Sequence, residues 1–126
     1  MNAAAIPATR VASLLASTAD GITADTAAIE LIARHDCFLH RTGFRRLITT
    51  SPAPASGQPA AVIRWQAVIH ALETGRLPCS SSEQAILRIA ASIGDPAIAV
   101  RLRTVLGSLD QHNLTLITTA ITRASS

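Results

Sequence analysis

Apolar side chains recur at helical spacing from the start of the chain. The first stripe comprises Val11, Leu14 and Leu15. These positions are three and four apart, so they lie on one face of a helix that begins near Pro7, a residue suited to the first helical turn. Asp20-Gly21 has turn chemistry, and we expect the helix to end there.

A second helix is expected to begin near Thr23 or Asp25. Its stripe comprises Ala28, Ile29 and Ile32. The pattern allows 25–49 to be one helix or two, depending on whether the chain breaks at His35-Asp36. A short last stretch of helix is marked by Phe44, Leu47 and Ile48.

Residues 50–60 have the composition of a linker. They include three prolines and a glycine, which forbid a helix, and few apolar side chains that could pack. We therefore expect a mobile Pro/Ala/Ser loop at about 50–60. The loop divides the chain into N-terminal helices over about 7–49 and C-terminal helices over about 61–124.

Helical stripes continue in the C-terminal half. The first comprises Val62, Trp65, Val68, Ile69 and Leu72, and the next comprises Ile86, Leu87, Ile89, Ala90 and Ile93. Ser80 and Glu83 have capping-box spacing before the second stripe, which is apolar over more than half its circumference and is expected at the centre of the fold. Asp95-Pro96 is expected to start another helix.

The last two stripes complete the predicted fold. The buried face of the helix after Asp95 is expected to be Ile98, Leu102, Val105 and Leu106, and the final helix, capped by Asp110, carries Leu114, Ile117 and Ile121. The prediction is an all-α, bundle-like single domain of five or six helices over 1–126. Each half is too short to be a comfortable core alone, so we expect the halves to pack together or across a dimer.

Composition and charge narrow the functional classes only slightly. The chain has 126 residues, 48% of them apolar, and all eleven basic residues are Arg, with a formal net charge of +3. A basic chain points to nucleic acid or another acidic partner, but the eight acidic residues are scattered among the arginines. We expect no leader and no membrane span, and Cys37 and Cys79 to stay reduced in the cytoplasm.

Candidate catalytic and metal-binding residues do not form recognised motifs. Cys37 and His40 have C-x-x-H spacing beside His35-Asp36, but a structural zinc site needs a second such pair, and the remaining candidates, Cys79, His70 and His112, are isolated in sequence. A G-x-S-x-G motif is absent, and a phosphate loop of the Walker type needs a lysine that this chain lacks. We therefore expect no enzyme activity, no metal and no cofactor.

A helix-turn-helix element is the main alternative to a purely structural interpretation. Residues 86–105 would place Ile89–Gly94 in the first helix and turn, and would offer Arg101, Arg103 and Thr104 to a major groove. Asp95 and Arg103 fit the motif poorly, because an apolar residue is expected at each position. An ordinary αα-hairpin explains the same spacing.

A second candidate surface is basic and comprises Arg34, Arg41, Arg45 and Arg46. If one helix ran through this region, Arg34, Arg41 and Arg45 would share a face that could meet phosphates or an acidic protein. The ordinary interpretation is a solvated face, and Gly43 would break the register.

Four segments carry a resemblance. They are His35-x-x-Phe38-Leu39-x-Arg41-x-x-Phe44, Leu77-Pro78-Cys79-Ser80-x-Ser82-Glu83, Ile89-Ala90-Ala91-Ser92-Ile93 and Gly107-x-Leu109-Asp110-x-x-Asn113-Leu114. Together they span most of residues 30–122, and the pattern resembles a group of small helical actinobacterial proteins. The resemblance implies a leaderless cytoplasmic protein and transfers no activity.

The functional expectation follows from the width of the apolar stripes on the predicted helices. Two short halves do not bury so much apolar surface alone, so we expect a non-enzymatic protein-interaction or scaffolding module that forms a homo-oligomer. The alternative is a DNA-binding regulator that uses 86–105.

Overall fold

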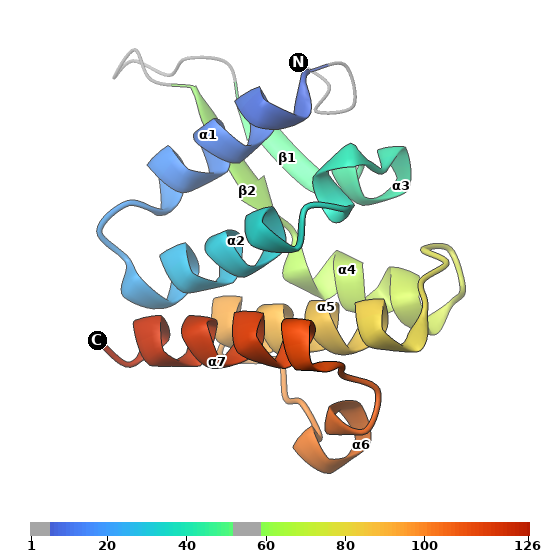
Figure 1. Cartoon of the computed structure of the whole chain (residues 1–126). Coiled ribbons are helices and arrows are strands. Elements are labelled where there is room, and N and C mark those ends of the chain that lie inside the picture. The colour runs from blue at the N-terminus through green and yellow to red at the C-terminus, as the bar shows by residue number, and fades with distance from the viewer. Residues whose placement is uncertain (1–5, 52–58) are drawn as a thin grey trace.

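The computed structural model describes residues 6–51 and 59–126. In these two segments the chain is mainly helical, with one β-hairpin (Figure 1). The elements in order are α1 (Ala8–Ala19), α2 (Thr23–His35), the 3-10 helix η2 (Phe38–His40), α3 (Thr42–Arg45), β1 (Ile48–Ser51), β2 (Ala60–Ile63), α4 (Trp65–Glu73), α5 (Ser81–Gly94), α6 (Leu102–Leu106) and α7 (Gln111–Ala124).

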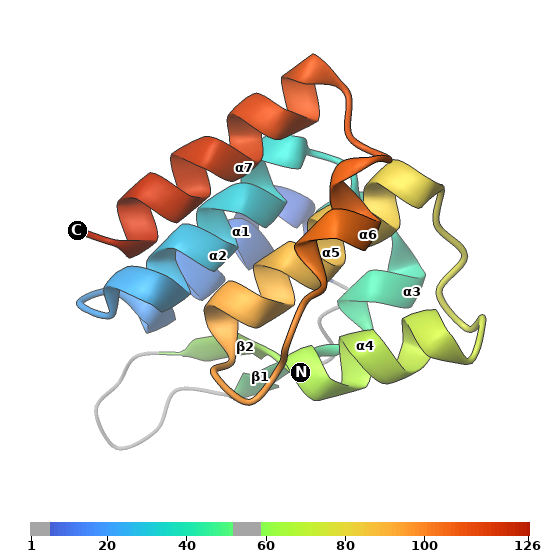
Figure 2. The same cartoon turned by 90° about the horizontal axis from the view of Figure 1, so that it is seen from below.

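Helices α2 and α5 form the centre of the molecule. Helix α2 packs against α1, α5 and α7, and α5 also contacts α4 and α6. Figure 2 shows α5 running between α4 on one side and α7 on the other. The buried residues of α5 are Ala85, Ile86, Leu87, Ile89, Ala90 and Ala91. They cover a wide arc of the helix, which confirms the prediction that this helix is central.

The hairpin corrects the all-α prediction. Strands β1 and β2 are antiparallel, with Ile48 opposite Ile63 and Ser51 opposite Ala60. Buried and exposed side chains alternate along β2, and the backbone N–H of Ala61 donates to Thr18 Oγ1 of α1 at 3.0 Å. The hairpin is thereby fastened to α1. The architecture is mainly helical, but it is neither all-α nor a bundle.

The predicted helix boundaries on both sides of the hairpin were wrong, because the residues assigned to helix ends there form strands. Ile48 was expected in a helix and Val62 at the start of one, yet both lie in strands, where β-branched side chains fit the pleated backbone. Of the predicted mobile loop 50–60, both ends lie in strands or next to one, whereas 52–58 lies outside the described residues.

The break at His35-Asp36 settles whether 25–49 is one helix or two. Asp36 follows the last residue of α2 in the left-handed conformation, with φ of 55°, which ends the helix. The chain then forms η2 and the four-residue α3. Phe38 and Phe44 from these two turns are fully buried, with ring centroids 5.5 Å apart.

Local capping fixes two helix starts as predicted and fails at a third. The capping box at α5 is formed: Glu83 N–H donates to Ser80 Oγ, and Ser80 N–H donates to Glu83 Oε1 at 2.8 Å. Asp110 caps α7. Asp95 was expected to cap a helix, but its carboxylate accepts from the N–H of Ala97 in a local turn. No helix follows until α6.

Candidate functional site

A group of connected polar side chains surrounds Arg41 and Glu83. The capping box holds Glu83 in the first turn of α5, and Arg41 follows η2. The Arg41 guanidinium forms an ion pair with the Glu83 carboxylate, and its Nη1 donates to the carbonyl of Pro78 at 3.4 Å. Burial alone would raise the pKa of Glu83. Hydrogen bonds from the Ser80 backbone and from Arg41 outweigh burial and lower that pKa.

Both cysteines border this ion pair. The Cys37 thiol donates to Glu83 Oε2 over 3.5 Å, and Arg41 Nη1 lies 3.7 Å from Cys79 Sγ. Burial raises the pKa of Cys37 to about 11 and also raises the pKa of Cys79. Because a thiolate is the reactive form, neither side chain is an activated nucleophile at neutral pH. This group joins the segment around η2 to the start of α5.

The C-x-x-H pair of Cys37 and His40 does not come together as a metal-binding pair. His40 Nε2 lies 3.1 Å from Asp36 Oδ1, while Cys37 contacts Glu83 instead of His40. Within 6–51 and 59–126, no three His, Cys, Asp or Glu side chains are grouped so that they could hold a metal ion. His35 stacks on Phe38 with centroids 5.0 Å apart, and burial lowers its pKa.

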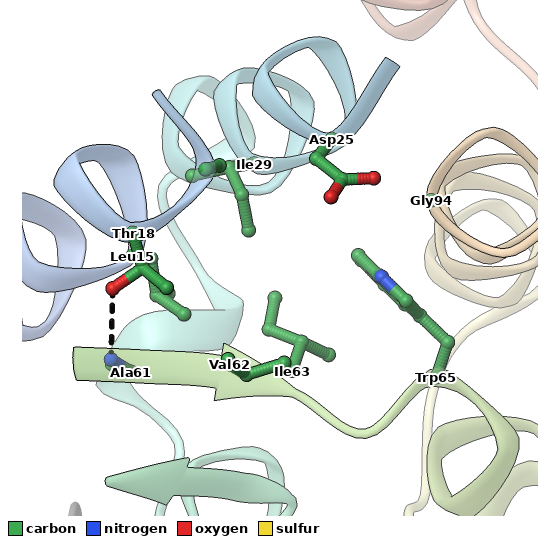
Figure 3. Close-up of a pocket in the computed structure, with 10 residues that line it drawn as sticks. Leu15, Thr18, Asp25, Ile29, Ala61, Val62, Ile63, Trp65 and Gly94 are labelled. Carbon is green, nitrogen blue, oxygen red and sulfur yellow. Dashed lines mark hydrogen bonds between the residues drawn. The ribbon is translucent and has the colours of Figure 1, made fainter. Parts of the chain in front are cut away.

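A small cavity lies between the hairpin, α1 and α2 (Figure 3). Its apolar lining includes Leu15, Ile29 and Ile63, and the Asp25 carboxylate and the Trp65 indole also line it. The volume is about 110 Å³. Sites for drug-sized ligands occupy about 300–1,000 Å³, so this cavity has room only for a few water molecules or a small fragment.

The residues predicted for a DNA-reading helix are exposed but are not on such a helix. Arg101 precedes α6, and Arg103 and Thr104 lie in it. Helix α6 has five residues, and 95–101 is not helical. The expected second helix from Asp95 is therefore absent, and the two-helix geometry of the motif is not formed.

The predicted basic face is also dispersed. Arg34 is exposed near the end of α2, whereas Arg41 is engaged with Glu83. Arg45 is half-buried in α3, and Arg46 is exposed just after it. Because α2 ends at His35, the proposed register through Arg34, Arg41 and Arg45 does not exist.

A different surface was missed because Leu102 and Leu106 were predicted to be buried, and Leu114 and Ile121 were assigned only to a helical stripe. Four aliphatic residues of the last two helices are well exposed, and we call them the α6/α7 face: Leu102 at 51%, Leu106 at 45%, Leu114 at 37% and Ile121 at 45%. Only Val105 and Ile117 of the predicted stripes are buried. Among the described residues, just two other large apolar side chains, Ile22 and Val62, are comparably exposed.

The geometry of α7 places Leu114 and Ile121 on one side of that helix. Ile121 and Arg123 are two positions apart, so they point in nearly opposite directions around the helix. Arg123 Nε lies 2.7 Å from Glu30 Oε2 and marks the flank of α7 next to α2. Ile121, and Leu114 seven positions before it, therefore lie on the flank toward α5. Figure 2 shows α6 on that same side of the molecule.

Most of the α6/α7 face carries little charge, whereas Leu102 at its edge lies between the exposed Arg101 and Arg103. From 104 to 122 the one charged residue is Asp110, whose carboxylate caps α7. The outward positions between the aliphatic side chains are mainly threonines, including Thr115, Thr118 and Thr122, whose hydroxyls bond to carbonyls of their own helix. Low charge and exposed aliphatic groups are properties of the central part of protein interfaces.

Comparisons with known proteins add no family or activity. No family model matches the chain, and neither a curated protein nor a solved structure matches it. None of the helices in 6–51 and 59–126 has the length and apolarity needed to cross a bilayer.

Proposed function

We propose that this protein is a non-enzymatic interaction or scaffolding module that associates with a second copy of itself through the α6/α7 face. The single observation that carries the proposal is the exposure of Leu102, Leu106, Leu114 and Ile121, the last three of which lie in a stretch whose one charged residue is Asp110. A cytoplasmic location remains part of the proposal and rests on the cysteine content.

Net charge opposes the association of two copies least where the α6/α7 face has no arginine. The chain carries a formal charge of +3, and two copies repel each other wherever their arginines face one another. The stretch 104–122 contributes no positive charge, so two copies can meet there at the least electrostatic cost. A two-fold contact brings the same aliphatic side chains together from both chains and buries them mutually.

DNA binding is the competing function. Arg101 and Arg103 are exposed beside the α6/α7 face, but they lack a recognition helix that could enter a major groove. Contacts from these two arginines to phosphates would be weakened by salt, whereas burial of aliphatic side chains would not.

The two functions predict opposite results in one experiment. Light scattering gives the mass of the purified protein at low and high salt, with and without duplex DNA. Self-association predicts twice the 13.1 kDa chain mass at both salt concentrations, unchanged by DNA. A monomer that enlarges only with DNA, and releases it in high salt, would replace the proposal with DNA binding.

A further inference from the structure

A second cavity, lined by basic residues, lies where α3, the end of the hairpin and α4 meet. Its volume is about 400 Å³. Leu47 and Ala67 contribute apolar lining, while Arg46, Arg64, His70 and Arg76 are exposed around it. No carboxylate lines this cavity, and none of the three arginines belongs to an ion pair found among the described residues.

The backbone brings two of these arginines together at one end of the hairpin, Arg46 before β1 and Arg64 after β2. The N–H of Arg64 donates to the carbonyl of Leu47 at 3.0 Å, which extends the pairing of the strands by one residue. Arg64 Nη2 also donates to the carbonyl of Arg46 at 3.0 Å. The Arg64 guanidinium is therefore held beside Arg46 before any ligand arrives.

The end of α4 supplies the third arginine. Gly75, with φ of +73°, ends the helix in the left-handed conformation, and the N–H of Arg76 donates back to the carbonyl of Ala71 at 3.0 Å. This Schellman arrangement turns the chain so that Arg76 borders the cavity. His70 lies three positions after Ala67, so it shares the same face of α4.

We propose that this cavity binds the phosphate group of a small organic phosphate. Three guanidinium groups without an acidic partner line one cavity and repel one another, and a bound anion offsets this repulsion. Arginine matches phosphate oxygens with parallel N–H donors, and the apolar lining at Leu47 and Ala67 can cover the organic part of the ligand.

The shape of the site favours a small molecule over a nucleic acid. The arginines converge on one concavity whose volume is in the range of small-molecule sites, rather than following a groove along the surface. The proposal is independent of self-association, because α5 separates α4 from α7 (Figure 2).

The test compares AMP with adenosine, which lacks the phosphate, by isothermal titration calorimetry on the full chain. The site variant is Arg46→Gln with Arg76→Gln, since neither side chain donates to another group in the described structure. The control, Arg101→Gln with Arg103→Gln, removes the same charge from exposed positions that do not line the cavity.

The expected result is saturable AMP binding, weakened about tenfold or more in the site variant and unchanged in the control. Equal binding of AMP and adenosine, equal loss in both variants, or no saturable AMP binding would overturn the proposal. A duplex oligonucleotide that displaces AMP and loses its own binding in the site variant would also overturn it, in favour of nucleic acid.

Discussion

Arg41 and Glu83 form an ion pair across 42 positions of sequence, and this pair connects the N-terminal helices to the start of α5. The same carboxylate completes the capping box with Ser80. Glu83 therefore has two roles, a local one in starting α5 and a long-range one in holding the segment after η2 against it.

Substitutions at Glu83 separate these two roles. Glu83→Gln can still complete the capping box but loses the ion pair, so we expect a loss of about 0.5–1 kcal/mol in the free energy of unfolding. Glu83→Ala loses both and should cost about 1 kcal/mol more. Urea unfolding measures both values. Equal losses in the two variants would contradict a separate contribution from the ion pair.

The ion pair also predicts a pH dependence on the acid side. The pKa of Glu83 is lower in the folded protein than its ordinary value, so its contribution is complete above that ordinary value. The contribution disappears as the pH falls through the lower folded pKa. Below about pH 4.5 the wild type should therefore lose stability more steeply than Glu83→Gln. Parallel curves for the two proteins would show that the carboxylate is not responsible.

Gly94 provides a test of packing between α4 and α5. A Cβ at this position would lie 2.7 Å from Trp65 Cε2, which is too close for any real contact. We expect Gly94→Ala to lower the free energy of unfolding by about 1–3 kcal/mol and to change the fluorescence of Trp65, the single tryptophan.

Gly107→Ala is the matched control. Gly107 has a right-handed helical conformation, and a Cβ there would meet open space. Alanine at this position should be neutral or stabilising by up to about 1 kcal/mol, because it restricts the unfolded chain. A Gly94→Ala protein as stable as the control would contradict the close contact with Trp65.

The two thiols should react slowly in the folded protein. A pKa of about 11 for Cys37, against an ordinary value of 9.0, reduces its thiolate at pH 8 by about a hundredfold. Reaction with a chromogenic disulfide should therefore be slow in buffer and fast in denaturant. A fast reaction of Cys37 in the native state, identified with Cys79→Ser, would contradict the raised pKa.

Local signals in the sequence predicted part of the fold. Ser80 and Glu83 gave the start of α5, because a capping box involves four consecutive residues. The hairpin was missed because short runs such as Ile48–Ser51 fit a helix or a strand equally well. The pairing of Ile48 with Ile63 makes this run a strand. The two residues are separated in sequence by the Pro/Ala/Ser segment, whose composition does not indicate a hairpin.

The candidate surfaces were harder to predict. Periodicity indicates which side chains share a face, but it does not show whether another element covers that face. Leu102 and Leu106 were therefore assigned to the core, although only Val105 between them is buried. The basic cavity was also missed, because Arg46, Arg64 and Arg76 come from separate elements that only the fold brings together.

The α6/α7 face can be altered without disturbing the core. Leu106→Gln with Ile121→Gln replaces two exposed aliphatic side chains by a residue with good helix propensity, so both helices should persist. Val62→Thr is the control, because it makes an equally exposed aliphatic position polar in β2 and keeps the β-branched shape. Circular dichroism should show native helix content in both.

The most direct test is the mass of these three proteins by light scattering over a concentration series. Self-association through the α6/α7 face predicts dimers for the wild type and Val62→Thr, and a shift to the 13.1 kDa monomer for Leu106→Gln with Ile121→Gln. A wild type that stays monomeric at all concentrations, or a double variant that remains as dimeric as the wild type, would contradict the account.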